Sequence, residues 1–112
     1  MIDDKLSSIL KEIFNKYNEI EKVILFGSRA RNDNSYYSDV DICIVGELVS
    51  HLILAKINMD IGEVNTPLSF DILAFNELSK KELINNILNE GVVIYNGQEI
   101  SWKSKWFYKR FA

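Results

Sequence analysis

Hydrophobic positions along the chain follow two periods, that of helices, about 3.6 residues, and that of strands, about two. The first segment is predicted to be an amphipathic helix because apolar side chains recur at helical spacing: Ile2, Leu6, Ile9, Leu10, Ile13, Phe14 and Tyr17. Apolar runs at residues 22–26 and 42–45 predict two strands. Helical spacing returns over residues 48–62, and a third strand-like run follows at residues 68–75.

The segment at residues 48–62 is long enough to cross over between the second and third strands, which permits these strands to pair in parallel. Ser79 and Glu82 have the spacing of a capping box and predict the start of a last helix, which Gly91 can end. Residues 92–95 then predict a fourth strand. The pattern therefore predicts an α/β (α+β) domain with a mixed four-stranded sheet flanked by helices.

The end of the chain differs in character from the rest. Asn96-Gly97 is a hairpin signal, so a short strand is predicted to return over residues 98–102. The last dozen residues interleave basic and aromatic side chains and contain no acid: Trp102, Lys103, Lys105, Trp106, Phe107, Tyr108, Lys109, Arg110 and Phe111. We expect this extension to pack on its own domain or on a partner protein, in preference to stacking on nucleic-acid bases.

Composition narrows the class of protein. The 112 residues fit one domain, and the formal net charge of −3, from 13 basic and 16 acidic residues, argues against binding a nucleic-acid template through counterion release. The single cysteine, Cys43, excludes an internal disulfide and favours a reducing compartment. There is no signal-peptide pattern and no apolar stretch of about 18 residues, so we expect a cytoplasmic protein without a membrane span.

Two aspartates at the start of the second strand are the first chemical signal. Asp39 and Asp41 are two residues apart, and in an extended strand both point to the same face. Their like charges repel unless a cation or proton offsets them, so packing alone does not explain them. Gly27 and Ser28 follow the first strand and can open a helix, where free N–H groups and the Ser28 hydroxyl favour a phosphate.

Asp71 supplies a third carboxylate inside the otherwise apolar third strand. If this strand lies beside that of Asp39 and Asp41, the three acids meet around one or two Mg²⁺ ions, in the geometry of two-metal phosphoryl chemistry. Arg31 is a candidate to reach the phosphates, although Arg29 and Arg31 are also typical of a solvated helix face.

These motifs resemble those of the minimal nucleotidyltransferases of the DNA polymerase β superfamily. The resemblance lies in Gly27-Ser28-Arg29-Ala30-Arg31, in Ser38-Asp39-Val40-Asp41 and in the later Asp71. It implies a nucleotidyltransferase domain over residues 1–97, with residues 98–112 as an extension. It further implies that Gly27 and Ser28 grip the phosphates of ATP, that Asp39, Asp41 and Asp71 hold Mg²⁺, and that Asp71 helps to deprotonate the attacking hydroxyl.

The resemblance also implies an acceptor, because stand-alone proteins of this kind resemble the antitoxin of two-component pairs. There the nucleotidyltransferase adenylylates a hydroxyl, typically of tyrosine, on an all-helical HEPN-type toxin encoded nearby. A non-catalytic subunit that neutralises or scaffolds a helical partner is one alternative. A small-molecule nucleotidyltransferase of the aminoglycoside-modifying kind, completed by a homo-oligomer, is another. The preferred nucleotide, the number of units added and self-association stay open.

Overall fold

The structure is a computed structural model, and it describes residues 1–97 of the chain. Its elements follow one another as α1 (Asp4–Asn15), β1 (Lys22–Phe26), α2 (Ser28–Arg31), β2 (Val40–Val45), α3 (His51–Gly62), β3 (Phe70–Ala74), the 3-10 helix η1 (Phe75–Glu77), α4 (Lys81–Glu90) and β4 (Val92–Asn96). The strands form one sheet in the order β3-β2-β1-β4. β1 is antiparallel to β2 and β4, whereas β2 and β3 are parallel. The predicted mixed sheet and parallel crossover are confirmed.

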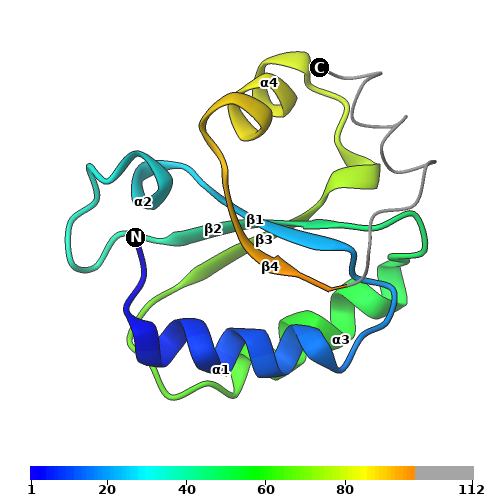
Figure 1. The fold of residues 1–112 in the computed structure, drawn as a ribbon, viewed down its shortest axis with the longest axis horizontal. Helices are drawn as coiled ribbons and strands as arrows, with labels where there is room; N and C mark the ends of the chain where they lie inside the picture. Colours follow the sequence, from blue (N-terminus) through cyan, green and yellow to red (C-terminus); the bar gives the residue numbers. More distant parts are fainter. Residues whose placement is uncertain (98–112) are drawn as a thin grey trace.

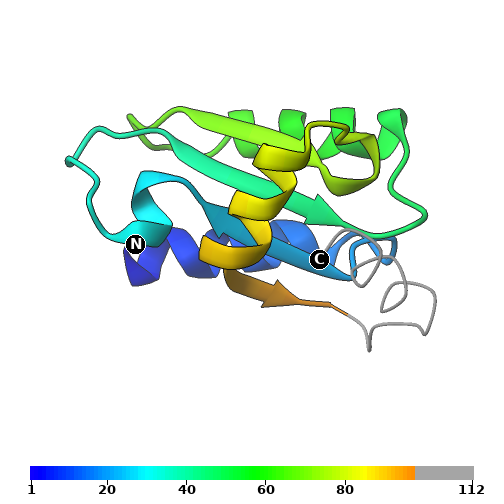
Figure 2. The same ribbon diagram turned by 90° about the horizontal axis from the view of Figure 1, so that it is seen from above.

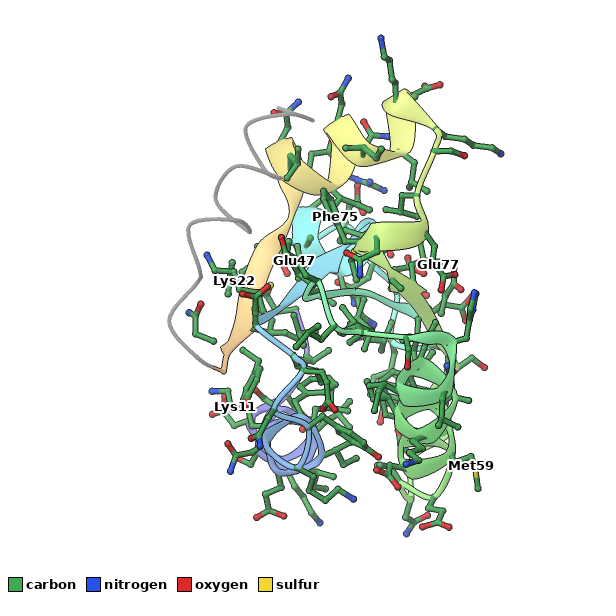
Figure 3. The ribbon with its side chains drawn as sticks, turned by 90° about the vertical axis from the view of Figure 1, so that its right-hand side faces the viewer. Lys11, Lys22, Glu47, Met59, Phe75 and Glu77 are labelled. Atoms are coloured by element: carbon green, nitrogen blue, oxygen red, sulfur yellow. The ribbon has the colours of Figure 1, made fainter. Side chains whose placement is uncertain are left out.

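Helices cover both faces of this sheet (Figure 1). α1 and α3 lie on one face, and their Leu10 and Ile57 belong to the larger hydrophobic core. α4 lies on the other face, where Ile84 and Ile87 form a smaller core with Phe75 of η1. Figure 3 shows the sheet between these two layers, with Phe75 on the α4 side.

The alternation of side chains along β2 and β3 shows on which face of the sheet their aspartates lie. In β2, Ile42 belongs to the core under α1 and α3, whereas Cys43 and Val45 belong to the core under α4. In β3, Ile72 packs against the first core and Leu73 against the second. Because successive strand residues point to opposite faces, Asp41 of β2 and Asp71 of β3 lie on the α4 side of the sheet, like Cys43 and Leu73.

Side-chain caps mark the observed starts of α1 and α3, and α3 begins at His51, three residues later than the predicted segment of residues 48–62. Asp3 accepts a hydrogen bond from the backbone N–H of Leu6 at 2.8 Å and caps α1. Ser50 accepts from the N–H of Ile53 at 3.2 Å and caps α3. Each cap satisfies a backbone donor that has no partner within the first turn. α1 is shorter than the apolar pattern at both ends. The cap at Asp3 leaves Ile2 outside the helix, and Tyr17 follows its end at Asn15.

The capping box predicted at Ser79 and Glu82 is wrong. α4 begins at Lys81, and the cap position belongs to Lys80, whose side chain makes no capping hydrogen bond. Burial of Ile84 and Ile87 against the sheet sets where this helix lies, and tertiary packing overrides the local capping signal. The predicted end of the helix is confirmed, since α4 stops at Glu90, one residue before Gly91.

Two predictions lie outside the described residues: the return strand over residues 98–102 and the aromatic and basic extension. Within residues 1–97, we find no helix that is both long and apolar enough to cross a membrane.

Candidate active site

The acids at positions 41 and 71 are direct neighbours across two parallel strands. The register of β2 and β3 pairs Asp41 with Asp71, and neighbouring strands are about 4.8 Å apart. Asp39 lies one residue before β2 rather than inside it. Both Asp39 and Asp71 are exposed and Asp41 is half-buried, so the group opens to solvent on the α4 side of the sheet.

The charges of the three acids affect one another. The pKa of Asp41 is raised above its ordinary value, first by burial of the carboxyl group and then by the negative charges of Asp71 and Asp39. The positive charge of Arg31 acts in the opposite direction. A group whose ionised form is disfavoured by burial and by like charges gains from a nearby cation. The site therefore favours binding of a positive ion.

The turn after β1 brings the backbone against this acid group. β1 ends at Phe26, which pairs with Asp41, and Gly27 follows with a positive φ of 74°. A Cβ built on Gly27 would stand 2.4 Å from Oδ2 of Asp41, so the Asp41 carboxylate would have to shift to make room for it. The positive φ favours glycine here, and any side chain would also displace the Asp41 carboxylate. The predicted Gly-Ser turn and the short helix α2 after it are confirmed.

Arg31, the predicted phosphate ligand, is engaged elsewhere in the described structure. Its Nε donates to Asp33 at 3.1 Å, and its Nη1 donates to Glu90, the last residue of α4, at 3.3 Å. These groups are exposed, and exposed ion pairs contribute little to stability. The guanidinium of Arg31 can therefore exchange these carboxylates for a phosphate at little cost.

Arg29 is buried, and its interpretation as part of a solvated helix face is wrong. Its side chain is 6% exposed, and its guanidinium donates to the backbone carbonyls of Met1, Tyr36 and Ser38. The sequence indicated only that Arg29 and Arg31 do not share a face, and not which of the two is buried. Residues two apart on a helix point about 200° apart, so Arg29 and Arg31 cannot share one solvent-facing side. Sequence reasoning missed the role of Arg29 in holding the loop before Asp39.

The three carboxylates are candidate ligands for a magnesium ion. Their oxygens are the donors that Mg²⁺ prefers. Among residues 1–97, no group of three His, Cys, Asp or Glu side chains is already arranged to hold a metal ion. This agrees with the usual chemistry of Mg²⁺, which takes one or two carboxylates together with substrate phosphates and water. Joint coordination by Asp39, Asp41 and Asp71 stays a prediction.

A cavity of about 360 Å³ is lined by residues that belong to the α1 side of the sheet, not by these acids. Its walls come from the start of α1, from the loop after α2 and from the segment between α3 and β3, with Arg29 and Tyr36 among them. None of the three acids lines it. The cavity is therefore distinct from the surface on which the carboxylates gather.

Comparison with known proteins identifies a family and a relative for this chain. The family described as Polymerase beta, Nucleotidyltransferase matches residues 9–100. A candidate protein adenylyltransferase of Methanocaldococcus jannaschii is 35% identical over an alignment of 94 residues, and the match covers 77% of this chain and 94% of that protein.

Solved structures share the fold at low sequence identity. A chain in a crystal structure of a toxin–antitoxin with AMP-PNP has a TM-score of 0.72 at 13% identity, covering 94% of this chain and 82% of its own. A chain in a structure of the tri-AMPylated Shewanella oneidensis HEPN toxin with MNT antitoxin has a TM-score of 0.59 at 14% identity, with coverages of 96% and 78%. At these identities the likeness shows the fold.

Proposed function

Since the chain belongs to the polymerase beta nucleotidyltransferase family, we propose that it transfers AMP from ATP to a hydroxyl group on a partner protein. The observation that carries the proposal is the parallel register of Asp41 and Asp71, with Gly27 packed directly against the Asp41 carboxylate. This geometry supports the proposal because a turn whose backbone can approach phosphates lies next to candidate ligands for the counterion of those phosphates. A structural role alone does not account for two neighbouring acids on a sheet.

In this proposal, the turn at Gly27 and Ser28 holds the triphosphate of ATP. The missing side chain of Gly27 lets the backbone approach a ligand, and the Ser28 hydroxyl offers a donor beside it. Arg31 leaves Asp33 and Glu90 and donates to a phosphate oxygen, a geometry that suits its planar, permanently charged guanidinium. The donor nucleotide and these contacts are expectations that binding measurements test.

The reaction forms one bond and breaks one bond at the α-phosphorus of ATP. The acceptor hydroxyl oxygen attacks this phosphorus, and the bond to the bridging oxygen of the β-phosphate breaks, so that pyrophosphate leaves. The hydroxyl proton passes to the exposed carboxylate of Asp71. When bound by Asp39 and Asp41, Mg²⁺ supplies positive charge that neutralises the phosphates and acidifies the attacking hydroxyl.

The acceptor is proposed to be a tyrosine of an all-helical HEPN-type toxin. Support for a protein acceptor comes from the Methanocaldococcus jannaschii relative, which is named for protein adenylylation and matches most of both chains. The fold neighbours from toxin–antitoxin structures, one of them with an AMPylated HEPN toxin, suggest which partner to test first. The protein is then an antitoxin that silences the toxin by modifying it.

Co-expression with a helical protein encoded beside this chain tests the proposal. We expect mass spectrometry to find AMP on a tyrosine of the partner with the wild type, and not with Asp39→Ala or Asp41→Ala. Glu12→Gln is the matched control, because Glu12 is an exposed acid on α1, on the other face of the sheet. The control should modify the partner as the wild type does.

A different result would favour the binding-only class of protein. If the partner is neutralised but unmodified by wild type and Asp39→Ala alike, and calorimetry finds no binding of ATP with Mg²⁺, the chain acts by contact. Modification of the partner on a residue other than tyrosine would correct only the acceptor.

A further inference from the structure

We propose that Arg29 is a positioning residue that holds Asp39 in place for the reaction. The inference rests on the proposed function, in which Asp39 holds nucleotide-bound Mg²⁺. Arg29 is the one charged side chain that is buried among residues 1–97. A buried charge is costly unless hydrogen bonds satisfy it, so its contacts should explain why it is there.

All four hydrogen bonds given by Arg29 end on backbone carbonyls. Nε and Nη2 both donate to the carbonyl of Ser38, at 3.1 and 2.9 Å. Nη2 also donates to the carbonyl of Tyr36 at 3.0 Å, and Nη1 to that of Met1 at 3.0 Å. This two-pronged contact needs the planar fork of arginine, because a lysine ammonium cannot reach the same carbonyls with that geometry.

Asp39 lies between two fixed points of the backbone. On its C-terminal side, the N–H of Val40 donates to the carbonyl of Ser69 at 2.9 Å, and the Val40 side chain is fully buried. On its N-terminal side, the fixed point is the Ser38 carbonyl that Arg29 holds. The sheet therefore anchors one side of Asp39, and Arg29 anchors the other.

The loop itself contributes little burial that could replace this anchor. Tyr36 and Tyr37 are 76% and 71% exposed, and their rings meet edge to face, with centroids 4.8 Å apart. Local hydrogen bonds between Ser35 and Ser38 close the turn, although they do not tie it to the domain. Figure 1 shows this loop reaching away from the sheet between α2 and β2. Its attachment before β2 thus depends on Arg29.

Arg29→Lys and Arg29→Gln, with Leu10→Ala as control, test the inference. Leu10 is buried under the sheet, so its truncation destabilises the domain without touching the loop. Arg29 holds the Ser38 carbonyl, and the Ser38 amide donates to Ser35 in the same turn. In both Arg29 variants we expect this turn to open more often and the Ser38 amide to exchange hydrogen about tenfold faster, the change that corresponds to losing one charge-assisted hydrogen bond. The Mg²⁺ concentration for half-maximal transfer should rise by a similar factor, and the KM for ATP at saturating Mg²⁺ should stay within about twofold.

Leu10→Ala should leave both quantities unchanged once the unfolded fraction is subtracted. The inference is overturned if Arg29→Lys keeps wild-type exchange at Ser38 and the wild-type Mg²⁺ requirement, or if Leu10→Ala shifts both as strongly. If the wild type neither binds ATP nor transfers AMP, the proposed function fails. The exchange at Ser38 then still decides whether Arg29 anchors the loop.

A measurement on the unmutated protein covers the case in which the Arg29 variants do not fold. The two arginines of α2 provide an internal comparison, since Arg29 is buried and Arg31 is partly exposed. By NMR, the Nε–H of Arg29 should exchange with water at least about tenfold more slowly than that of Arg31. Equal exchange rates would show that the contact with Ser38 does not persist in solution, and the inference would be wrong.

Discussion

The carboxylate of Asp41 fills the space that a side chain on Gly27 would need: a Cβ built on Gly27 would stand 2.4 Å from Oδ2 of Asp41. β1 and β2 lie side by side in the sheet (Figure 2). Phe26 of β1 pairs with Asp41 of β2 across these antiparallel strands, next to the turn at Gly27. The proposed phosphate grip and the proposed metal ligand are therefore one packed unit.

Gly27→Ala should lower both stability and nucleotidyl transfer. The residue has φ 74° and ψ −154°, a backbone region that is costly for any residue with a Cβ, by about 1–3 kcal/mol. The added methyl group also pushes the Asp41 carboxylate away. Urea unfolding and a transfer assay measure the two effects. Gly62→Ala is the matched control, because a Cβ there meets no atom within 4 Å, and it should be neutral or slightly stabilising.

Asp71→Asn should separate chemistry from nucleotide binding. In the proposed mechanism Asp71 takes the hydroxyl proton, a contribution of about 10²–10⁴-fold in rate. We expect transfer to fall within this range while the Kd for ATP with Mg²⁺ changes by only a few fold. Single-turnover kinetics and calorimetry give the two values. An unchanged rate would remove Asp71 from the reaction.

Asp41→Asn should inactivate the protein and stabilise its fold. Burial, Asp71 and Asp39 raise the pKa of Asp41 above 3.8, so its charged form is disfavoured in the folded state. Removing the charge should gain a few tenths to about 1 kcal/mol at neutral pH without divalent ions, a value discounted for solvent screening. The gain should shrink as pH falls through the folded pKa toward 3.8, since the wild-type carboxyl is then neutral. A lower Tm for Asp41→Asn at pH 7 would contradict this.

Tyr17 should make stability fall at high pH. Its hydroxyl donates to Asp60 of α3, and burial followed by this contact raises its pKa from 10.0 to about 12. A raised pKa means that the folded state favours the neutral tyrosine. Its contribution is therefore complete below pH 10 and is lost as pH rises to about 12. Tyr17→Phe should have a lower Tm than the wild type at pH 8, and the difference should vanish near pH 12.

Cys43 should be unreactive in the folded protein. Its side chain is fully buried in β2, and burial raises the pKa of the thiol to about 12, so little thiolate forms at neutral pH. A thiol reagent should therefore label it only through opening of the sheet. We expect labelling to accelerate steeply across the urea transition. Rapid labelling in native buffer would mean that β2 is accessible from the α4 side.

Local patterns were sufficient for most of the architecture. Apolar runs marked β1, β2 and β4, and the long apolar helix after β2 indicated that β3 returns parallel to it. These predictions hold because periodicity and connection length act over short distances along the chain. The predicted cap at Ser79 failed for the same reason. The prediction rested on a local capping hydrogen bond, and the packing of α4 against the sheet is stronger than that local preference.

The sequence by itself determined the candidate chemistry, because the spacing of Asp39, Asp41 and Asp71 among apolar strands is local information. Only the tertiary structure decided the register that sets Asp71 beside Asp41 and the contact that confines Gly27. It alone decided the burial of Arg29, whose carbonyl partners lie 7 to 28 residues away. Such long-range contacts depend on how the helices and strands pack, and no local pattern encodes them.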